Sequence, residues 1–377
     1  MADLRLAIVH DYLNQYGGAE RVVEAFHRIY PSAPIFTSLY DAGKMPDSFA
    51  QADVRTSFLQ HVPLSMSAPK LLLPLYPMAF ESLDVRGYEA VLSSSSAFGK
   101  GVITDPETPH ICYCHTPMRF AWRYHDYMER EGYSAPMRWV LAVIIGRLRA
   151  WDLRTAGNVD YFVANSHTVA RRIDRAYRRD AHVIHPPVEC ARFRPAESGA
   201  DFFLIVSRLR AYKRIDIAVA AFNQLGLPLR IVGDGNHRGR LQHIAAPNIQ
   251  FLGRLPDADV AELFSQCRAL IFPGEEDFGI TPLEAHAAGR PVIAYEAGGA
   301  LETVIEGETG LFFREPIPDA LAAAVRAFDP AAFDPARIRR HAEQFDVPVF
   351  ERRIREFVEA KVQEHRERMQ RPRDPDP

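Results

Sequence analysis

The sequence predicts an α/β protein made of two doubly wound parallel-sheet domains that face each other across a cleft. Two series of short apolar strands that alternate with amphipathic segments support this prediction, one over residues 4–188 and one starting at residue 202. Residues 189–199 follow a pair of prolines and form the linker between them. We therefore expect domains at 1–188 and 189–346, a final helix at 347–369 and a disordered tail at 370–377.

The composition suits a globular protein and excludes several function classes. The 377 residues are 47% hydrophobic and 25% charged, and a formal net charge of −3 gives no basic footprint for nucleic acid. The four cysteines lack the paired spacing of a zinc site, which favours free buried thiols and a reducing cytoplasm. We expect no signal peptide, and the longest purely apolar run, 139–145, is too short to span a bilayer.

The first series opens with a strand at 4–10, a loop that ends in Gly17 and Gly18, and a helix at 19–30. Such a turn brings backbone N–H groups against an anion, although its spacing is not that of a dinucleotide fingerprint. Further strands are predicted at 35–40 and 90–94. The stretch between them at 68–80 is interrupted by prolines, and three uses for it stay open: a buried loop, an interfacial membrane patch or a lipid-acceptor groove.

A histidine follows the next strand. Residues 111–114 form the strand and His115 lies at its carboxyl end, where ligands gather in open α/β sheets. A lone histidine is more often structural, but this one has neighbours in the sequence that are typical of a reactive site. They are Arg119, Trp122, Arg123 and His125. A helix at 136–156, a strand at 161–164 and a helix opened by Asn165 and Ser166 complete the series.

The second series places two cations after its first strand. Arg208 and Lys213 lie in one turn behind the strand at 202–207, as solvated charges or as ligands of an anion. The next strand, 229–232, leads into a glycine loop that nearly copies a nucleotide-cofactor fingerprint but has one residue too many. Its glycines are Gly233, Gly235 and Gly239. A nicotinamide-dependent oxidoreductase is therefore one alternative function.

The stretch at 276–284, Glu-Asp-Phe-Gly-Ile-Thr-Pro-Leu-Glu, follows an apolar strand and opens a helix. We expect Thr281 as the N-cap, Pro282 at the first helical position and Glu284 closing a capping box. A helix N-terminus binds phosphate through unpaired N–H groups, and Gly279 has no side chain to keep an oxygen away. Glu276 and Glu284 flank this anion site, where carboxylates suit sugar hydroxyls. Taken singly, Glu284 also fits a mere capping role and Glu276 a solvated charge.

The pattern Glu-x-Phe-Gly-x4-Glu, followed by Ala-x-Ala-x-Gly-x-Pro-Val-Ile, resembles the signature of the retaining family 4 glycosyltransferases. The resemblance implies the GT-B arrangement, with the acceptor bound by the first domain, the donor by the second, and a last helix that returns to the first. It implies that Glu276 contacts the donor sugar, that Glu284 holds the ribose, and that Arg208 and Lys213 hold the pyrophosphate.

The resemblance extends to residues outside that pattern. It implies catalytic roles for His115, Glu276, Arg208 and Lys213. The implied donor-binding residues are Gly17, Gly18, Arg208, Lys213, Gly233, Gly235, Arg254, Glu276, Phe278, Gly279, Ile280, Thr281 and Glu284. The implied acceptor-binding residues are Asp11, Tyr12, Arg119, Trp122 and Arg123.

The implied function is transfer of a sugar from a nucleoside-diphosphate donor to a glycan or a polyprenyl-diphosphate-linked acceptor. The phrases His-Asp-Tyr-Leu and Cys-His-Thr-Pro-Met-Arg look most like bacterial polysaccharide mannosyltransferases, which favours GDP-mannose. We expect no cofactor and no obligatory metal, and a cytoplasmic protein that contacts the inner membrane face peripherally through residues 68–80 if these form the membrane patch. A non-catalytic sugar-nucleotide binding protein is the second alternative.

Overall fold

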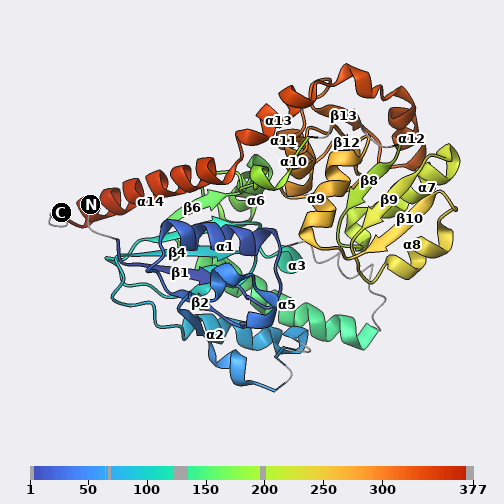
Figure 1. The fold of residues 1–377 in the computed structure, drawn as a ribbon. Helices are drawn as coiled ribbons and strands as arrows, with labels where there is room; N and C mark the ends of the chain where they lie inside the picture. Colours follow the sequence, from blue (N-terminus) through green and yellow to red (C-terminus); the bar gives the residue numbers. More distant parts are fainter. Residues whose placement is uncertain (1–3, 64, 67–68, 123–134, 196–200, 371–377) are drawn as a thin grey trace. The chain divides into compact units, whose positions relative to one another are not determined.

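The computed structural model describes residues 4–63, 65–66, 69–122, 135–195 and 201–370 (Figure 1). The chain divides into two compact units, Met1–His185 with Phe350–Pro377, and Pro186–Val349. The predicted site residue Arg123, the predicted tail beyond residue 370 and the centre of the predicted linker lie outside the described residues.

A seven-stranded, wholly parallel sheet forms the centre of the first unit, in the order β3-β2-β1-β4-β5-β6-β7. Its strands are β1 (Leu6–His10), β2 (Ile35–Thr37), β3 (Val54–Thr56), β4 (Ala90–Ser95), β5 (His110–Cys114), β6 (Tyr161–Ala164) and β7 (Ala181–Val183). Because the chain moves outward from β1 through β3 and then returns to β4 on the other side, strand order reverses between β1 and β4. Ligands bind at such reversal points, beyond the carboxyl ends of the strands.

Alternation of side chains explains how both faces of this sheet are buried. In β1, Leu6 and Ile8 belong to the core on one face of the sheet, the first core, and Ala7 and Val9 to the core on the other face, the second core. This alternation follows from the two-residue period of a strand. The first core also takes the apolar side of the long helix α14 (Val347–Gln370). Its buried apolar residues recur every four positions, and each burial contributes about 1.5–3 kcal/mol. They are Phe350, Ile354, Val358 and Val362. The expectation that the final helix returns to the first unit is thus confirmed.

The remaining helices of the first unit are α1 (Gly18–Ile29), α2 (Tyr76–Glu81), α3 (Arg119–Trp122), α5 (Ala135–Ala156) and α6 (His167–Tyr177). The stretch at 68–80, for which a buried loop was one of the open uses, is helical where the structure describes it, because a 3-10 helix at Pro69–Leu75 runs directly into α2. The prolines do not prevent this, since Pro77 lies in the first turn of α2, where no donor is needed. Tyr76 and Phe80 anchor α2 in the second core.

The second unit has a six-stranded parallel sheet in the order β10-β9-β8-β11-β12-β13. Its strands are β8 (Phe203–Val206), β9 (Leu229–Val232), β10 (Ile249–Gly253), β11 (Leu270–Phe272), β12 (Val292–Tyr295) and β13 (Gly310–Phe313). Its helices are α7 (Ile215–Leu225), α8 (Arg238–Ile244), α9 (Asp257–Gln266), α10 (Ile280–Ala287), α11 (Ala300–Thr303), α12 (Pro318–Ala327) and α13 (Pro335–Glu343). Strand order reverses here between β8 and β11.

The four cysteines are free and buried, as predicted. Within the described ranges, we find no helix that combines the length and the apolar character needed to cross a membrane. The predicted fold class, two Rossmann-like parallel-sheet units, is confirmed.

Candidate active site

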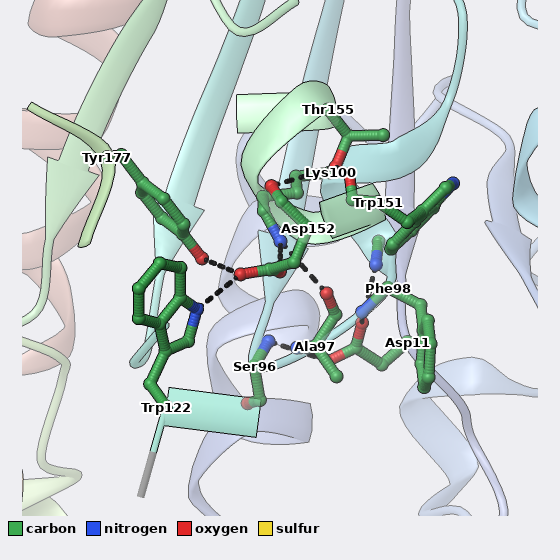
Figure 2. Close-up of polar contacts among 11 residues, drawn as sticks. Asp11, Ser96, Ala97, Phe98, Lys100, Trp122, Trp151, Asp152, Thr155 and Tyr177 are labelled. Atoms are coloured by element: carbon green, nitrogen blue, oxygen red, sulfur yellow. Dashed lines mark hydrogen bonds and ion pairs between the residues drawn. The ribbon is translucent and has the colours of Figure 1, made fainter. Parts of the chain in front are cut away.

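The end of β1 is fixed to the end of β4 by one carboxylate. Asp11 is only 2% exposed, and its two oxygens accept four consecutive backbone N–H groups, those of residues 96–99, at 2.6–3.0 Å (Figure 2). A carboxylate that accepts several N–H bonds is held rigidly and satisfies a loop that would otherwise bury unpaired donors. The structure therefore gives Asp11 a positioning role in the loop after β4, while its predicted contact with an acceptor stays a prediction.

A second buried acid lies behind this loop and was missed from the sequence. Asp152 on α5 is ion-paired with Lys100, and both side chains are at most 2% exposed. The other carboxylate oxygen accepts hydrogen bonds from Trp122 Nε1 and Tyr177 Oη, each at 2.7 Å (Figure 2). Burial alone would lower the pKa of Lys100, but Asp152 outweighs burial and the net pKa is raised, so the ammonium stays charged.

This pair gives Trp122 a structural partner within the unit, while its predicted contact with an acceptor stays a prediction. Its indole N–H is bound to Asp152, and the side chain packs against the second core. Lys100 in turn donates to the carbonyl of Ala97 at 3.0 Å, so the same loop is held by Asp11 from one side and by Lys100 from the other. No sequence motif marks Asp11 or Asp152 for this role, because the groups that each one binds lie far away in the sequence.

His115 follows β5 directly and is half-buried. Its ring Nε2 lies 2.8 Å from Ser94 Oγ, and its carbonyl accepts a hydrogen bond from Asn165 Nδ2 at 3.1 Å. Tyr12, beyond β1, and Arg119, at the start of α3, are also half-buried. Gly17 is the N-cap of α1, in an extended conformation, and Gly18 is its first residue. The structure thus places these predicted residues on segments at the carboxyl end of the first sheet.

In the second unit, the reversal point between β8 and β11 holds an ion pair. Lys213, in the turn after β8, pairs with Glu276, in the loop after β11, and their side chains are 13% and 20% exposed. Two residues predicted to be catalytic are therefore in direct contact. Arg208 is exposed in the same turn, and Arg254 is exposed just after β10. The pair is accessible enough for a ligand to contact both groups.

The helix after Glu276 begins earlier than predicted. Gly279 is the N-cap of α10 and has a φ of +84°, a left-handed conformation that glycine adopts without strain. Thr281 and Pro282 therefore lie inside the first turn, and the predicted capping box with Thr281 as N-cap is wrong. Pro282 is still tolerated, because the first-turn N–H groups have no partner within the helix. The N–H groups of this turn remain where an anion site was predicted.

Glycines that were not predicted as site residues shape the loop around Glu276. A Cβ atom on Gly274 would lie 2.7 Å from the carbonyl oxygen of Lys213. A Cβ on Gly298 would lie 2.3 Å from the carbonyl oxygen of Glu276, and one on Gly299 would lie 2.1 Å from that of Phe278. The Glu276 loop is therefore packed, backbone against backbone, between the Lys213 turn and the segment after β12. No larger residue fits at these three positions.

The glycine loop after β9 has a packing explanation too. A Cβ on Gly233 would lie 1.9 Å from the carbonyl oxygen of Ser207, and one on Gly235 would lie 2.3 Å from that of Leu209. These glycines let the loop press against the turn that carries Arg208 and Lys213. Their spacing therefore needs no dinucleotide to account for it, which removes the main support for the oxidoreductase alternative.

Comparison with known families accounts for most of the chain. Residues 16–192 match the family described as Glycosyltransferase Family 4, and residues 191–345 match Glycosyl transferases group 1. A D-rhamnosyltransferase, WbpZ of Pseudomonas aeruginosa, is 37% identical over 136 residues, which cover 34% of this chain and 36% of that protein. The O-antigen chain mannosyltransferase C of Escherichia coli is 35% identical over 163 residues, covering 40% and 43%. The chain thus spans less than half the length of these two relatives.

Solved structures resemble nearly the whole chain. Anabaena HepE, in complex with UDP and glucose, superposes with a TM-score of 0.71 at 19% identity and covers 94% of this chain and 99% of its own. The sucrose-phosphate synthase of Thermosynechococcus elongatus gives a TM-score of 0.74 at 18% identity, covering 96% and 99%. At this level of identity, the likeness speaks for the fold.

The role of Asp11 can be tested by stability. Asp11→Asn replaces one acceptor oxygen by a donor that faces backbone N–H groups, so we expect a loss of about 2–4 kcal/mol in the free energy of unfolding. Urea titration of the full chain measures it. Asp84→Asn is the matched control, because its carboxylate is exposed and pairs only with the exposed Arg86. If both substitutions lowered the free energy of unfolding by the same small amount, Asp11 would not fix the loop after β4.

Proposed function

The chain belongs to the family 4 glycosyltransferases of GT-B fold, and from that premise we propose that it transfers a sugar from a nucleoside-diphosphate donor to an acceptor hydroxyl with retention of configuration. The second unit would bind the donor and the first the acceptor. The observation that carries the proposal is the Lys213–Glu276 ion pair at the reversal point of the second sheet, one loop before the N-terminus of α10.

These groups match the parts of a nucleoside-diphosphate sugar. Lys213 and Arg208 supply positive charge for the diphosphate, and the first-turn N–H groups of α10 supply further donors. Glu276 accepts hydrogen bonds from the hydroxyls of the sugar, and Glu284, within α10, accepts them from the ribose. Phe278 is 3% exposed and packs in the core behind the loop, so it positions Glu276 by packing.

The proposed reaction needs charge stabilisation more than a protein nucleophile. The bond between the anomeric carbon and the diphosphate oxygen breaks, and a new bond to the acceptor oxygen forms on the same face. The acceptor proton passes to the departing phosphate. Negative charge therefore grows on the diphosphate, where Lys213 and Arg208 stabilise it. Binding of the diphosphate competes with Glu276 for Lys213, which releases Glu276 toward the sugar.

The relatives support a narrower proposal for the substrates. One is named as an O-antigen chain mannosyltransferase and another as a D-rhamnosyltransferase. We infer GDP-mannose as the donor and a glycan or polyprenyl-diphosphate-linked glycan as the acceptor. HepE was solved with UDP, which supports a nucleoside diphosphate in this fold without choosing the base.

Membrane contact of the first unit would serve such an acceptor. Of the exposed large apolar side chains in the described residues, four belong to the short segment from η3 (Phe58–His61) to α2. They are Phe58, Met66, Leu71 and Met78, the last two 71% and 55% exposed. By contrast, Leu72 and Leu73 pack against the second core. We propose that the exposed set inserts into the interfacial layer of the inner membrane.

A panel of nucleotides tests the donor assignment. We expect GDP to bind, GDP-mannose to be turned over, and NAD to do neither. Glu276→Ala should lower turnover at least 10²-fold while GDP still binds, because its proposed partner is the sugar. Glu284→Ala should instead weaken the binding of GDP itself, because the proposed partner of Glu284 is the ribose. Calorimetry and single-turnover assays separate the two effects, and the reverse pattern would show that the two carboxylates have been assigned wrongly.

The charge assignment predicts transfer without a divalent metal. Lys213→Ala should lower turnover by about 10²- to 10³-fold, because it removes a fixed charge aimed at the leaving group. Arg210→Ala is the matched control, since Arg210 is an exposed cation of the same turn. Wild-type activity should survive exhaustive chelation. Loss of activity in chelator that magnesium or manganese restores would refute this mechanism.

The membrane proposal predicts a selective loss of vesicle binding. In Leu71→Ser/Met78→Ser, co-sedimentation with vesicles of phosphatidylglycerol and phosphatidylethanolamine should fall about tenfold or more, because two exposed apolar side chains no longer insert. Circular dichroism should stay unchanged. Ile244→Ser is the control, because Ile244 is 43% exposed on the other unit. An equal loss in the control, or wild-type protein that does not sediment with vesicles, would exclude this surface.

A further inference from the structure

A buried chain of polar side chains leads from α1 to His115. It begins at Glu20, whose Oε1 lies 3.7 Å from His10 Nε2, an ion-pair contact longer than a hydrogen bond. His10 Nδ1 lies 3.0 Å from the carbonyl oxygen of Ser94 and 3.1 Å from its Oγ. Ser94 Oγ lies 2.8 Å from His115 Nε2. Glu20, His10 and Ser94 are at most 3% exposed, so this chain is shielded from water.

The positions of the hydrogens follow from the acceptors. A backbone carbonyl only accepts, so the contact of His10 Nδ1 with the carbonyl of Ser94 requires a hydrogen on Nδ1. The same N–H faces Ser94 Oγ, so the hydroxyl accepts on that side. The Ser94 hydroxyl has a single hydrogen, and of its two side-chain partners only His115 Nε2 can accept it, so we assign His115 Nε2 as an unprotonated acceptor. A neutral His115 with an acceptor at Nε2 carries its proton on Nδ1.

The Glu20–His10 pair keeps this arrangement in place. Burial alone would lower the pKa of His10, but Glu20 on α1 and Asp11 beside it on the chain outweigh burial, and the pKa is raised. Burial alone would raise the pKa of Glu20, yet the neighbouring His10 outweighs burial and the pKa of Glu20 is lowered. The raised pKa of His10 beside the Glu20 carboxylate favours the imidazolium, which carries a hydrogen on both nitrogens, and the contact with the Ser94 carbonyl keeps Nδ1 a donor. Gly17 leaves room for Glu20, since a Cβ there would lie 3.3 Å from Oε2.

We propose that Ser94, oriented by the buried His10–Glu20 pair, is a positioning residue that fixes His115 as the Nδ1–H tautomer. With its hydrogen on Nδ1, His115 has a hydrogen-bond donor at that nitrogen and not an acceptor. This rests on the proposed function, in which the ligand is a sugar substrate and the family resemblance implies a catalytic role for His115. An N–H group at Nδ1 of His115 suits a sugar hydroxyl, because the hydroxyl oxygen can accept the hydrogen bond. It selects against a ligand group that can only donate.

The tautomer is measured directly by NMR of the full chain with ¹⁵N-labelled histidine. The sequence has 14 histidines, so the His115 signals are assigned by their loss in His115→Asn. At neutral pH, wild-type His115 should show the proton on Nδ1. In Ser94→Ala it should move to Nε2, the site that an unconstrained imidazole prefers. Ser94→Thr keeps the hydroxyl and should restore the wild-type pattern. Thermal unfolding checks that this variant is folded.

Ser93→Ala is the matched control. Ser93 is on the same strand, is equally buried, and hydrogen-bonds another histidine, with its Oγ 2.8 Å from His110 Nε2. This substitution should leave the His115 tautomer unchanged. Turnover of GDP-mannose should fall about tenfold in Ser94→Ala, as expected for one lost hydrogen bond, and less in the control.

The spectrum separates this proposal from the proposed function. A wild-type His115 with its proton on Nε2, or a tautomer that is the same in Ser94→Ala and wild type, would overturn the positioning role even if GDP-mannose is a substrate. Conversely, the predicted change of tautomer supports the role whichever sugar nucleotide is turned over.

Discussion

Each sheet of this protein is constrained by the reversal of its strand order. Parallel strands all end at one edge, and at a reversal the two loops beyond neighbouring strands turn away from each other and leave backbone groups to be satisfied. In the first unit, Asp11 satisfies four such groups in the loop after β4. Ser94, the last but one residue of β4, lies two residues before this loop, and His115, beyond β5, donates its backbone N–H to the carbonyl of Ser95 at 2.9 Å.

The second unit solves the same problem with backbone instead of a buried acid. Gly274, Gly298 and Gly299 allow the Glu276 loop to touch its neighbours directly, and Gly233 and Gly235 do so for the turn that carries Lys213. Rigid loops on both sides keep the two charged side chains within contact. A site whose charges are placed in advance loses little free energy to reorganisation when a charged ligand binds.

Much of the fold was predictable because apolar strands and amphipathic helices are local signals. The motif residues Glu276 and Lys213 were also found from the sequence, although only the structure shows that they touch. What failed was conformational or long-range. The start of α10 depends on the backbone of Gly279, which no residue pattern reports. The role of Asp11 depends on amides 85–88 residues away, and that of Asp152 on Lys100, 52 residues away.

His10 illustrates why such residues are not found from sequence motifs. In the sequence, it is the last residue of an apolar strand, and Glu20 is an unremarkable acid in a helix. Each alone would be costly to bury. Together their opposite charges offset part of that cost. Because β1 pairs with β4 and His10 lies opposite Ser94, the second ring nitrogen of His10, Nδ1, contacts Ser94. A buried pair that stabilised only the fold would do so equally well beside any acceptor. Here its acceptor is also bound to His115, so the buried pair sets which nitrogen of that ring carries the proton.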